Sequence, residues 1–488
     1  MHTYLFTFSL SLLLSMGLTP VVISFARRSG TVDNPNVRKV HSSPISRIGG
    51  VAVFVSMMAL TIPVLFLPNI IGASFRDISA KVIATLAASS FIFLVGLVDD
   101  LKGLRVRHKL AAQLAAAIVI CSFGIRINTL TLTEIFSIDF GWFSWPLTIL
   151  WIVGVTNAVN IIDGLDGLAA GISAITCGVI AVLAIYFGQP VMAVLMLALL
   201  GSLTGFLFFN FSPAKIFMGD CGSMFLGFLL ASSSVMCAAK SQMLVGLALP
   251  VLALGVPIFD TLFSMLRRFL ERRSIFSPDR SHFHHRLLAL GLKQSHAVII
   301  IYIVTFIFAA LGMFMMATRN INTIIVFACI LLLMVIVFRV VGSVRLRETI
   351  EGLRKKYAVT SQTNKEIRSF EAAQLHFRHA ETFEQWWHAV SFAAEKLEFS
   401  SVNMLLTNRD RTFKLLKWRN DGNTPTSREM LKVDVPVRDR RSGPSLNLKI
   451  EVCRDGSLEA AGRKVALFTR LVDEKSPAAL PAKANPDV

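Results

Sequence analysis

Charged side chains are scarce in this chain of 488 residues: they make up 16% of it, whereas hydrophobic residues make up 54%. The mean hydropathy is +0.62, which excludes an ordinary soluble domain and indicates a protein with several membrane spans. Acidic residues are fewer than basic ones, so the formal net charge is +18. In a membrane protein this excess belongs to loops beside anionic headgroups, so we expect membrane lipids, and no nucleic acid, as partners.

Cysteine is also rare, and its placement excludes several kinds of site. The six cysteines form no Cys-x-x-Cys pair and have no spacing typical of metal ligands, so we expect no disulfide framework. Five of them fall in or beside apolar runs, where packing is the expected role. The chain also lacks a Walker A motif and a kinase-type glycine-rich loop, which disfavours a pump driven by nucleotide hydrolysis.

Long apolar runs alternate with short polar breaks up to about residue 342. A transmembrane helix needs roughly 20 mostly apolar residues. The predicted fold is an all-α polytopic membrane protein with about 11 transmembrane helices, followed by a small C-terminal α+β cytoplasmic domain. The eleven expected spans lie near residues 3–25, 48–68, 80–98, 109–126, 145–161, 167–187, 190–209, 222–239, 242–266, 297–317 and 321–342.

Basic residues predict the orientation of these spans. Arg27 and Arg28 follow the first run and no basic region precedes it, so we expect a retained span with the N-terminus outside and the C-terminus inside. The odd-numbered connections are then cytoplasmic, and they carry most of the loop lysines and arginines, as the positive-inside rule requires.

The same connections hold all the unusual polar sequence. They read "DNPNVRKVHSSPISRIGG" (33–50), "DDLKGLRVRHK" (99–109), "NAVNIIDGLDG" (157–167), "NFSPAKIFMGDCGS" (210–223) and "SPDRSHFHHRLLALG" (277–291). The outer connections look like plain linkers. The pattern predicts a catalytic or binding surface at the cytoplasmic boundary of the membrane.

Five aspartates in these loops suggest a metal ion. Carboxylates gathered in a small area repel one another unless a divalent cation lies between them, and hard oxygen ligands suit Mg²⁺, with room left for substrate phosphates. Each aspartate taken alone is also consistent with capping a helix N-terminus. All five together favour the metal: Asp99, Asp100, Asp163, Asp166 and Asp220.

Basic and donor residues lie on the same expected face, where they would favour phosphate. "MGDCGS" adds two glycines at a helix start, whose free N–H groups and dipole attract anions. The His-x-His-His run could instead bind zinc, but no cysteine is near it, and Arg280 and Arg286 favour an anionic ligand. Acidic metal ligands among basic phosphate ligands at a membrane surface indicate phosphoryl transfer with one lipid reactant.

The five loops resemble the successive signatures of the polyprenyl-phosphate N-acetylhexosamine-1-phosphate transferases, in the same order, over roughly residues 1–342. "DRSHFHHRL" is similar to the His-x-His-His form of the WecA/TagO-like branch rather than to the three consecutive histidines of the MraY-like branch. The resemblance implies a UDP-N-acetylhexosamine donor, with UDP-N-acetylglucosamine as first choice, and undecaprenyl phosphate as acceptor. The implied place is the bacterial cytoplasmic membrane, with the active site on its cytoplasmic face.

The resemblance also implies roles for individual residues, with Mg²⁺ as cofactor and Mn²⁺ as an alternative. Asp220 would be the main metal ligand, with Asn160 or Asp163 as the second, and Asp99 and Asp100 would orient or deprotonate the lipid phosphate. Asp99, Asp100, Asp163 and Asp220 form the implied catalytic group. The lipid phosphate would lie near His41, Arg47 and Lys109, and the nucleotide sugar near Asp166, Asn210, Lys215, Gly219, His282, His284, His285 and Arg286.

The remaining sequence lies outside the resemblance. Residues 1–342 form the expected transferase domain, 343–370 a charged helical linker, 371–474 a small α+β domain and 475–488 a disordered tail. The order of elements in the α+β domain is similar to part of a GAF domain. Trp386 and Trp387 could stack on a ligand, although core packing is favoured. We expect the domain to serve oligomerisation, for example as a homodimer, or partner docking.

Two rival functions fit a polytopic membrane protein. A transporter of an anionic solute would place its charges near the bilayer midplane on broken helices, whereas these carboxylates gather at one interface. A membrane sensor would not need several cytoplasmic loops rich in acidic, basic and histidine residues. The transferase is therefore the predicted function, and the transporter is its alternative.

Overall fold

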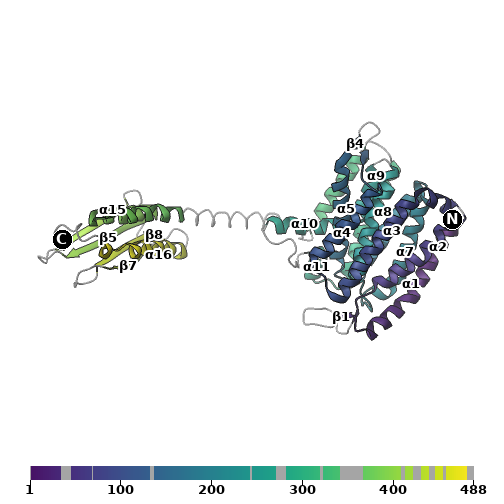
Figure 1. Cartoon of the computed structure of the whole chain (residues 1–488), viewed down its shortest axis with the longest axis horizontal. Coiled ribbons are helices and arrows are strands. Elements are labelled where there is room, and N and C mark those ends of the chain that lie inside the picture. Colours follow the sequence, from purple (N-terminus) through teal and green to yellow (C-terminus); the bar gives the residue numbers. More distant parts are fainter. Residues whose placement is uncertain are drawn as a thin grey trace. The chain divides into compact units, whose positions relative to one another are not determined.

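The computed structural model describes two compact units, covering residues 1–349 and 350–488 (Figure 1). Each is considered by itself. The described residues are 2–33, 45–68, 70–131, 137–241, 244–270, 282–318, 322–340, 367–407, 413–420, 430–438, 446–453 and 458–480.

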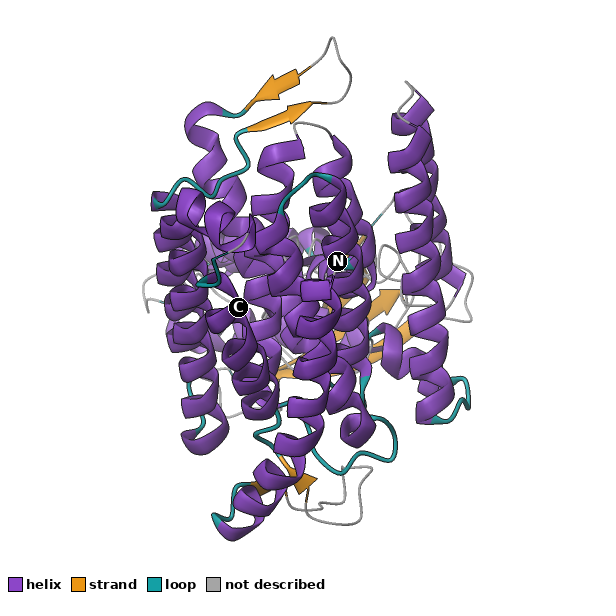
Figure 2. Ribbon diagram, turned by 90° about the vertical axis from the view of Figure 1, so that its right-hand side faces the viewer, coloured by secondary structure: helices purple, strands orange, loops and turns teal. Residues whose placement is uncertain are grey.

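The first unit is a bundle of helices (Figure 2). Within its described part, seven helical stretches are long and apolar enough to cross a membrane, and α2 and part of α13 are shorter apolar helices. A multi-pass membrane protein is therefore confirmed, while the count of eleven stays a prediction. The helices are α1 (His2–Arg28), α2 (Gly50–Leu65), α3 (Ile70–Lys102), α4 (Val106–Ser122), α5 (Ser144–Ile162), α6 (Leu168–Tyr186), α7 (Pro190–Asn210), α8 (Gly219–Ser241), α9 (Leu244–Ala253), α10 (Gly255–Leu270), α11 (Phe283–Ala289), α12 (Gln294–Thr318) and α13 (Asn322–Val340).

Two expected spans differ from the helices observed. The described part of the expected span 242–266 is divided between two short helices, α9 and α10, which meet at Leu254. Proline explains the break: Pro257 lacks an N–H, and its ring disfavours helical geometry in the preceding turn. The stretch 80–98 belongs to the longer α3, which bends where Ile78 leaves helical geometry.

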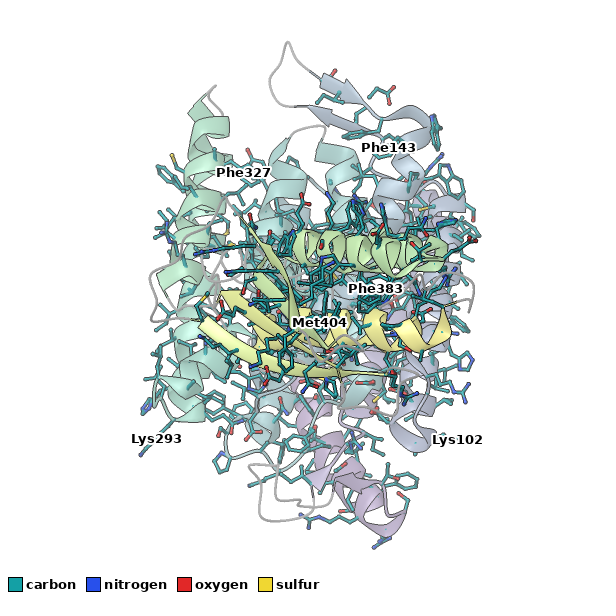
Figure 3. The ribbon with its side chains drawn as sticks, turned by 90° about the vertical axis from the view of Figure 1, so that its left-hand side faces the viewer. Lys102, Phe143, Lys293, Phe327, Phe383 and Met404 are labelled. Atoms are coloured by element: carbon teal, nitrogen blue, oxygen red, sulfur yellow. The ribbon has the colours of Figure 1, made fainter. Side chains whose placement is uncertain are left out.

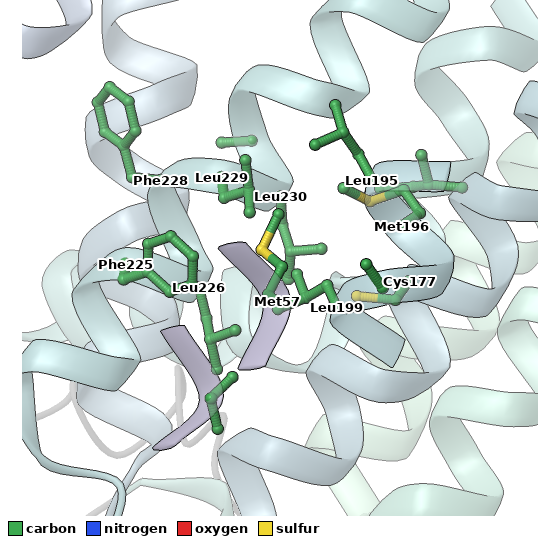
Figure 4. Packing of buried hydrophobic residues seen from close by; sticks show 14 of the residues in the cluster. Met57, Cys177, Leu195, Met196, Leu199, Phe225, Leu226, Phe228, Leu229 and Leu230 are labelled. Atoms are coloured by element: carbon green, nitrogen blue, oxygen red, sulfur yellow. The ribbon is translucent and has the colours of Figure 1, made fainter. Parts of the chain in front are cut away.

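Helix α8 lies at the centre of the bundle, packed on α3 and α5, and nearly all of it is buried. Figure 4 shows the apolar packing around it, with Leu230 of α8 in one cluster with Met57 of α2 and Leu199 of α7. The α8 serines from Ser223 to Ser234 are buried as well, and the hydroxyls of Ser232 and Ser234 donate to carbonyls of the preceding turn. Its modest hydropathy follows from this position, because α8 faces protein rather than lipid.

Two small strand pairs lie at opposite ends of the bundle (Figure 1). Strands β3 (Thr129–Thr131) and β4 (Ser137–Asp139) form a hairpin before the short helix η1 (Gly141–Phe143). Strands β1 (Val32–Asp33) and β2 (Ile45–Ser46) pair at the other end. In Figure 3 Lys102 and Lys293 lie at one end of the bundle and Phe143 and Phe327 at the other, so connections from distant parts of the chain share a face.

The second unit is a four-stranded antiparallel sheet in the order β6-β5-β8-β7, covered by helices. Met404 of β5 and the fully buried Trp386 of α15 belong to its core (Figure 3 labels Met404). Core packing is thus confirmed for Trp386, and Trp387 packs partly buried on the same core. The elements are α15 (Phe383–Lys396), β5 (Phe399–Thr407), β6 (Phe413–Arg419), β7 (Met430–Val437), β8 (Leu446–Cys453), α16 (Leu458–Glu474) and η2 (Pro477–Ala479).

The core packing of this domain extends beyond the expected limits of 371–474 at both ends. Residues 367–379 are helical, and Phe370, in the expected linker, packs partly buried on the core. Residues 475–480 belong to it as well, because the Lys475 carbonyl accepts the Trp386 indole N–H at 2.7 Å and Leu480 is buried in the core. The rest of the expected tail and of the linker lies outside the described residues.

Candidate functional site

Lys109 joins carboxylates from two different helices. It stands near the start of α4, and its Nζ lies 2.5 Å from Asp99 Oδ2 on α3 and 2.7 Å from Asp220 Oδ2 on α8. The amide Nδ2 of Asn160, near the end of α5, donates to Asp220 Oδ1 and to Ser223 Oγ, both at 2.9 Å. Four helix ends therefore meet at Asp220, and one ammonium group offsets the repulsion between two carboxylates.

Asp100, next to Asp99, caps helix α8 from outside that helix. Its two carboxylate oxygens accept the backbone N–H groups of Asp220 and Cys221, both at 2.9 Å. These N–H groups carry the positive end of the α8 dipole, which a carboxylate stabilises. Because Asp100 does this, the side chain of Asp220 is not used as a cap and remains in the cluster with Lys109.

The polypeptide before α2 is held against the turn that starts α8. Ser46 forms a parallel bridge with Ile216, and the N–H groups of Gly49 and Gly50 donate to the carbonyls of Phe217 and Met218 at 3.0 and 2.7 Å. Arg47 thus lies beside the α8 turn. His41, expected near the same acceptor phosphate, lies outside the described residues.

The loop between α5 and α6 carries Asp163 and Asp166. Asp166 Oδ2 accepts the Ala214 N–H at 3.0 Å, which ties this loop to the one between α7 and α8. Asp163 is partly buried, and burial together with the carboxylates of Asp220, Asp100 and Asp166 raises its pKa to about 8. A site that raises a carboxyl pKa in this way is short of positive charge.

The loop between α7 and α8 contributes its own expected residues. The Nδ2 of the buried Asn210 donates to the Ile216 carbonyl at 2.8 Å, so this side chain shapes the loop from within. The side chain of Lys215 is exposed. The structure therefore places Lys215, and not Asn210, where a ligand could contact it without displacing a hydrogen bond.

The histidines near α11 complete the site. His282 and His284 are buried, and their rings are parallel with centroids 5.7 Å apart. His285 adjoins them, its ring 4.3 Å from that of His284, and Arg286 follows on the same helix. A Cβ on Gly164 would lie 3.1 Å from His284 Nε2, so the histidines pack directly on the Asp163–Asp166 loop.

Residues absent from the predicted site hold these pieces in place. Asp260, on α10, contacts His282 Nδ1 at 3.1 Å and accepts the Phe283 N–H at 2.8 Å. The Tyr302 hydroxyl, on α12, donates to the Gly167 carbonyl at 2.5 Å. Both lie inside apolar stretches far from the loops in sequence. A lone acid in an apolar run was the available signal for Asp260.

Burial lowers the pKa of His284 to about 4; the adjacent His285 and His282 act in the same direction, and Asp260 opposes them. The unfolded chain takes up this proton below about pH 6.5, whereas the folded protein does so only near pH 4. We therefore expect acidification from pH 7 to 5 to remove about 2 kcal/mol of stability through this residue. Thermal unfolding of the detergent-solubilised protein should show the loss, and His284→Gln should show a smaller one. An equal pH dependence in both proteins would contradict the assignment.

A metal ion would find oxygen ligands here, although no complete set of side chains. Among the residues that the structure describes, no three His, Cys, Asp or Glu side chains are grouped to hold a metal. The hard oxygens around Asp220 suit Mg²⁺, which takes one or two carboxylates and completes its coordination with water and substrate phosphates. The raised pKa of Asp163 also favours an added cation. The donor chemistry thus fits Mg²⁺ better than a fully protein-bound metal such as structural zinc.

Fold and site together define a class: an integral membrane protein with acidic, basic and histidine side chains gathered at one end of its helix bundle. Residues 82–238 match the family described as glycosyl transferase family 4. A probable undecaprenyl-phosphate N-acetylglucosaminyl 1-phosphate transferase of Bacillus subtilis (strain 168) is 40% identical over 333 residues, which cover 67% of this chain and 90% of the relative.

Two further relatives support the same family assignment. The undecaprenyl-phosphate alpha-N-acetylglucosaminyl 1-phosphate transferase of Escherichia coli (strain K12) is 26% identical, covering 63% of this chain and 84% of the relative. A phospho-N-acetylmuramoyl-pentapeptide-transferase of Halalkalibacterium halodurans is 32% identical, covering 64% of this chain and 97% of the relative. The chain belongs to glycosyl transferase family 4, and the predicted family is confirmed.

Proposed function

We propose that this enzyme transfers N-acetylglucosamine-1-phosphate from UDP-N-acetylglucosamine to undecaprenyl phosphate, releasing UMP. The product, an undecaprenyl-diphospho-sugar, would start a cell-envelope polysaccharide. The observation that carries the proposal is the Lys109 bridge between Asp99 and Asp220, beside Asn160, where the ends of four helices meet. The names of the Bacillus subtilis and Escherichia coli relatives support the choice of sugar and lipid. Neither the site nor the relatives favour the transporter.

In the proposed reaction, an oxygen of the lipid phosphate forms a bond with the sugar-linked phosphorus of the donor. The bond from that phosphorus to the oxygen of the UMP phosphate breaks, and UMP leaves with its electron pair. A phosphate monoester has its second pKa near 6, so at neutral pH the attacking oxygen is mostly deprotonated already. The enzyme then has little need of a strong base.

The main difficulty is bringing two anions together in a region of low dielectric constant, where their repulsion is large. Lys109, Arg47 and the histidines near α11 would reduce it, and holding both substrates in line would supply most of the remaining acceleration. Mg²⁺, or Mn²⁺ in its place, would be held by Asp220 with Asn160 or Asp163, and would neutralise phosphate charge when bound. Asp166 would face the nucleotide.

The proposed location of the site is the cytoplasmic face of the bacterial cytoplasmic membrane. Its support is the distribution of lysine and arginine, which are concentrated in the connections that carry the site. With the site on this face, a UDP-sugar from the cytoplasm would reach it without crossing the bilayer.

An assay of the purified full-length enzyme tests the proposal. With undecaprenyl phosphate and Mg²⁺, we expect UMP release and a lipid-linked product with UDP-N-acetylglucosamine, and much less with UDP-glucose. Omitting the lipid is the control for simple hydrolysis of the donor. Failure to release UMP with any UDP-N-acetylhexosamine would overturn the proposed reaction, and preference for another N-acetylhexosamine would overturn the choice of sugar.

A further inference from the structure

A buried carboxylate on α10 is bonded to the start of the histidine helix. The Asp260 side chain lies on a helix that is otherwise mainly apolar, and Asp260 is only 3% exposed. Its Oδ1 accepts the Phe283 N–H at 2.8 Å, and its Oδ2 lies 3.1 Å from His282 Nδ1. His282 is the N-cap residue of α11 but provides no side-chain cap, so Asp260 supplies the cap from another helix.

A structural explanation alone would not require a charge here. Burying a carboxylate costs free energy, and an apolar residue could join α10 to α11 by packing. The carboxylate does what an apolar residue cannot: it distinguishes the two nitrogens of an imidazole. Because Oδ2 is an acceptor, the nitrogen facing it, Nδ1, must carry a proton. The Ser264 hydroxyl, 3.3 Å from the same nitrogen, lies on the same side of the ring.

The orientation of His282 fixes its neighbours as well. The His284 ring is stacked parallel to that of His282, and its Nε2 packs against Gly164 in the loop that carries Asp163 and Asp166. His284 Nδ1 is buried and is 3.9 Å from Asp260, too far for a hydrogen bond. Of these two histidines, only His282 is within hydrogen-bond distance of Asp260, and the stacking of the two rings carries its orientation to His284.

We infer that Asp260 is a positioning residue for the donor: it fixes the His282 ring with Nδ1 protonated, so that the lone pair of Nε2 is left to accept a hydrogen bond from a hydroxyl group of the UDP-sugar. This inference rests on the proposed function, in which the histidines bind the nucleotide sugar. Helix α10 carries none of the loop motifs, yet through Asp260 it takes a direct part in forming the donor site.

Kinetics of the full-length enzyme test the inference. Asp260→Asn keeps the size of the side chain, but its amide can donate to Nδ1 and so favours the other tautomer. We expect the KM for the UDP-sugar to rise at least tenfold, with the KM for undecaprenyl phosphate within about twofold of wild type. The matched control is Thr261→Val, which changes a neighbouring buried side chain whose hydroxyl has no hydrogen-bond partner among the described residues. An unchanged donor KM, or equal changes for both substrates, would overturn the inference.

Nitrogen NMR of the full-length protein labelled with ¹⁵N-histidine provides a second test that does not depend on turnover. His282→Gln identifies the His282 signals. We expect a protonated Nδ1 in the wild type and a shift toward protonated Nε2 in Asp260→Asn. A wild-type ring with bare Nδ1 would overturn the inference even if the enzyme were active. Absence of UMP release together with the expected signals would instead locate the failure in the proposed reaction.

Discussion

Asp220→Asn is expected to lower turnover by about a thousandfold or more while leaving the protein folded. The substitution removes the negative charge that Lys109 and Asn160 hold in place at the start of α8. A neutral amide is a poor ligand for Mg²⁺, and losing the charge that positions a cation costs several kcal/mol of transition-state stabilisation. Folding should survive, because Asp100 rather than the Asp220 side chain caps α8.

The measurement is the initial rate of UMP release at saturating substrates, together with thermal unfolding of the same preparation. Asp139→Asn is a suitable control, since Asp139 is an exposed carboxylate in the hairpin at the other end of the bundle. A rate for Asp220→Asn within tenfold of wild type would remove Asp220 from the catalytic group. A large loss of thermal stability would show that its role in folding had been underestimated.

Among substitutions that replace no polar side chain of the site, Gly219→Ala should lower activity the most. Gly219 has φ +76°, a conformation that costs other residues about 1–2 kcal/mol. An added Cβ would also overlap the Arg47 carbonyl oxygen and lie 2.7 Å from Asp100 Oδ2. The turn before α8 must then move, and with it the Asp100 cap and the Asp220 side chain. We expect a loss of activity of about a hundredfold, together with a lower unfolding temperature.

Gly178→Ala is the matched control, because Gly178 lies within α6 and a Cβ there would meet nothing within 4 Å. Alanine favours helix over glycine, so this variant should be as stable as wild type or slightly more stable. Comparing UMP release and unfolding temperature in the two variants isolates the effect of position. Equal behaviour of the two proteins would mean that the turn before α8 tolerates a side chain.

Most of the site was predictable because membrane sequences report their topology locally. Apolar runs and basic loops assign residues to one side of a bilayer without any knowledge of packing, and that assignment alone brings Asp99, Lys109 and Asp220 to one face. Hydropathy identifies a span less clearly where a helix is surrounded by other helices rather than by lipid. Helix α8 is rich in serine because it is buried among other helices, and Pro257 divides a run that hydropathy alone describes as continuous.

The sequence by itself determined the membrane class, the family, the loops that carry the site, and the residue types available for phosphate and metal. Only the tertiary structure decided how the carboxylates divide their work. Asp99 and Asp100 are adjacent in the chain, yet one pairs with Lys109 and the other caps α8, because their side chains leave the end of α3 in different directions. Asp260 likewise acquires its role only where α10 meets α11. A hydrogen bond depends on distance and direction in space, and spacing along the sequence specifies neither between separate helices.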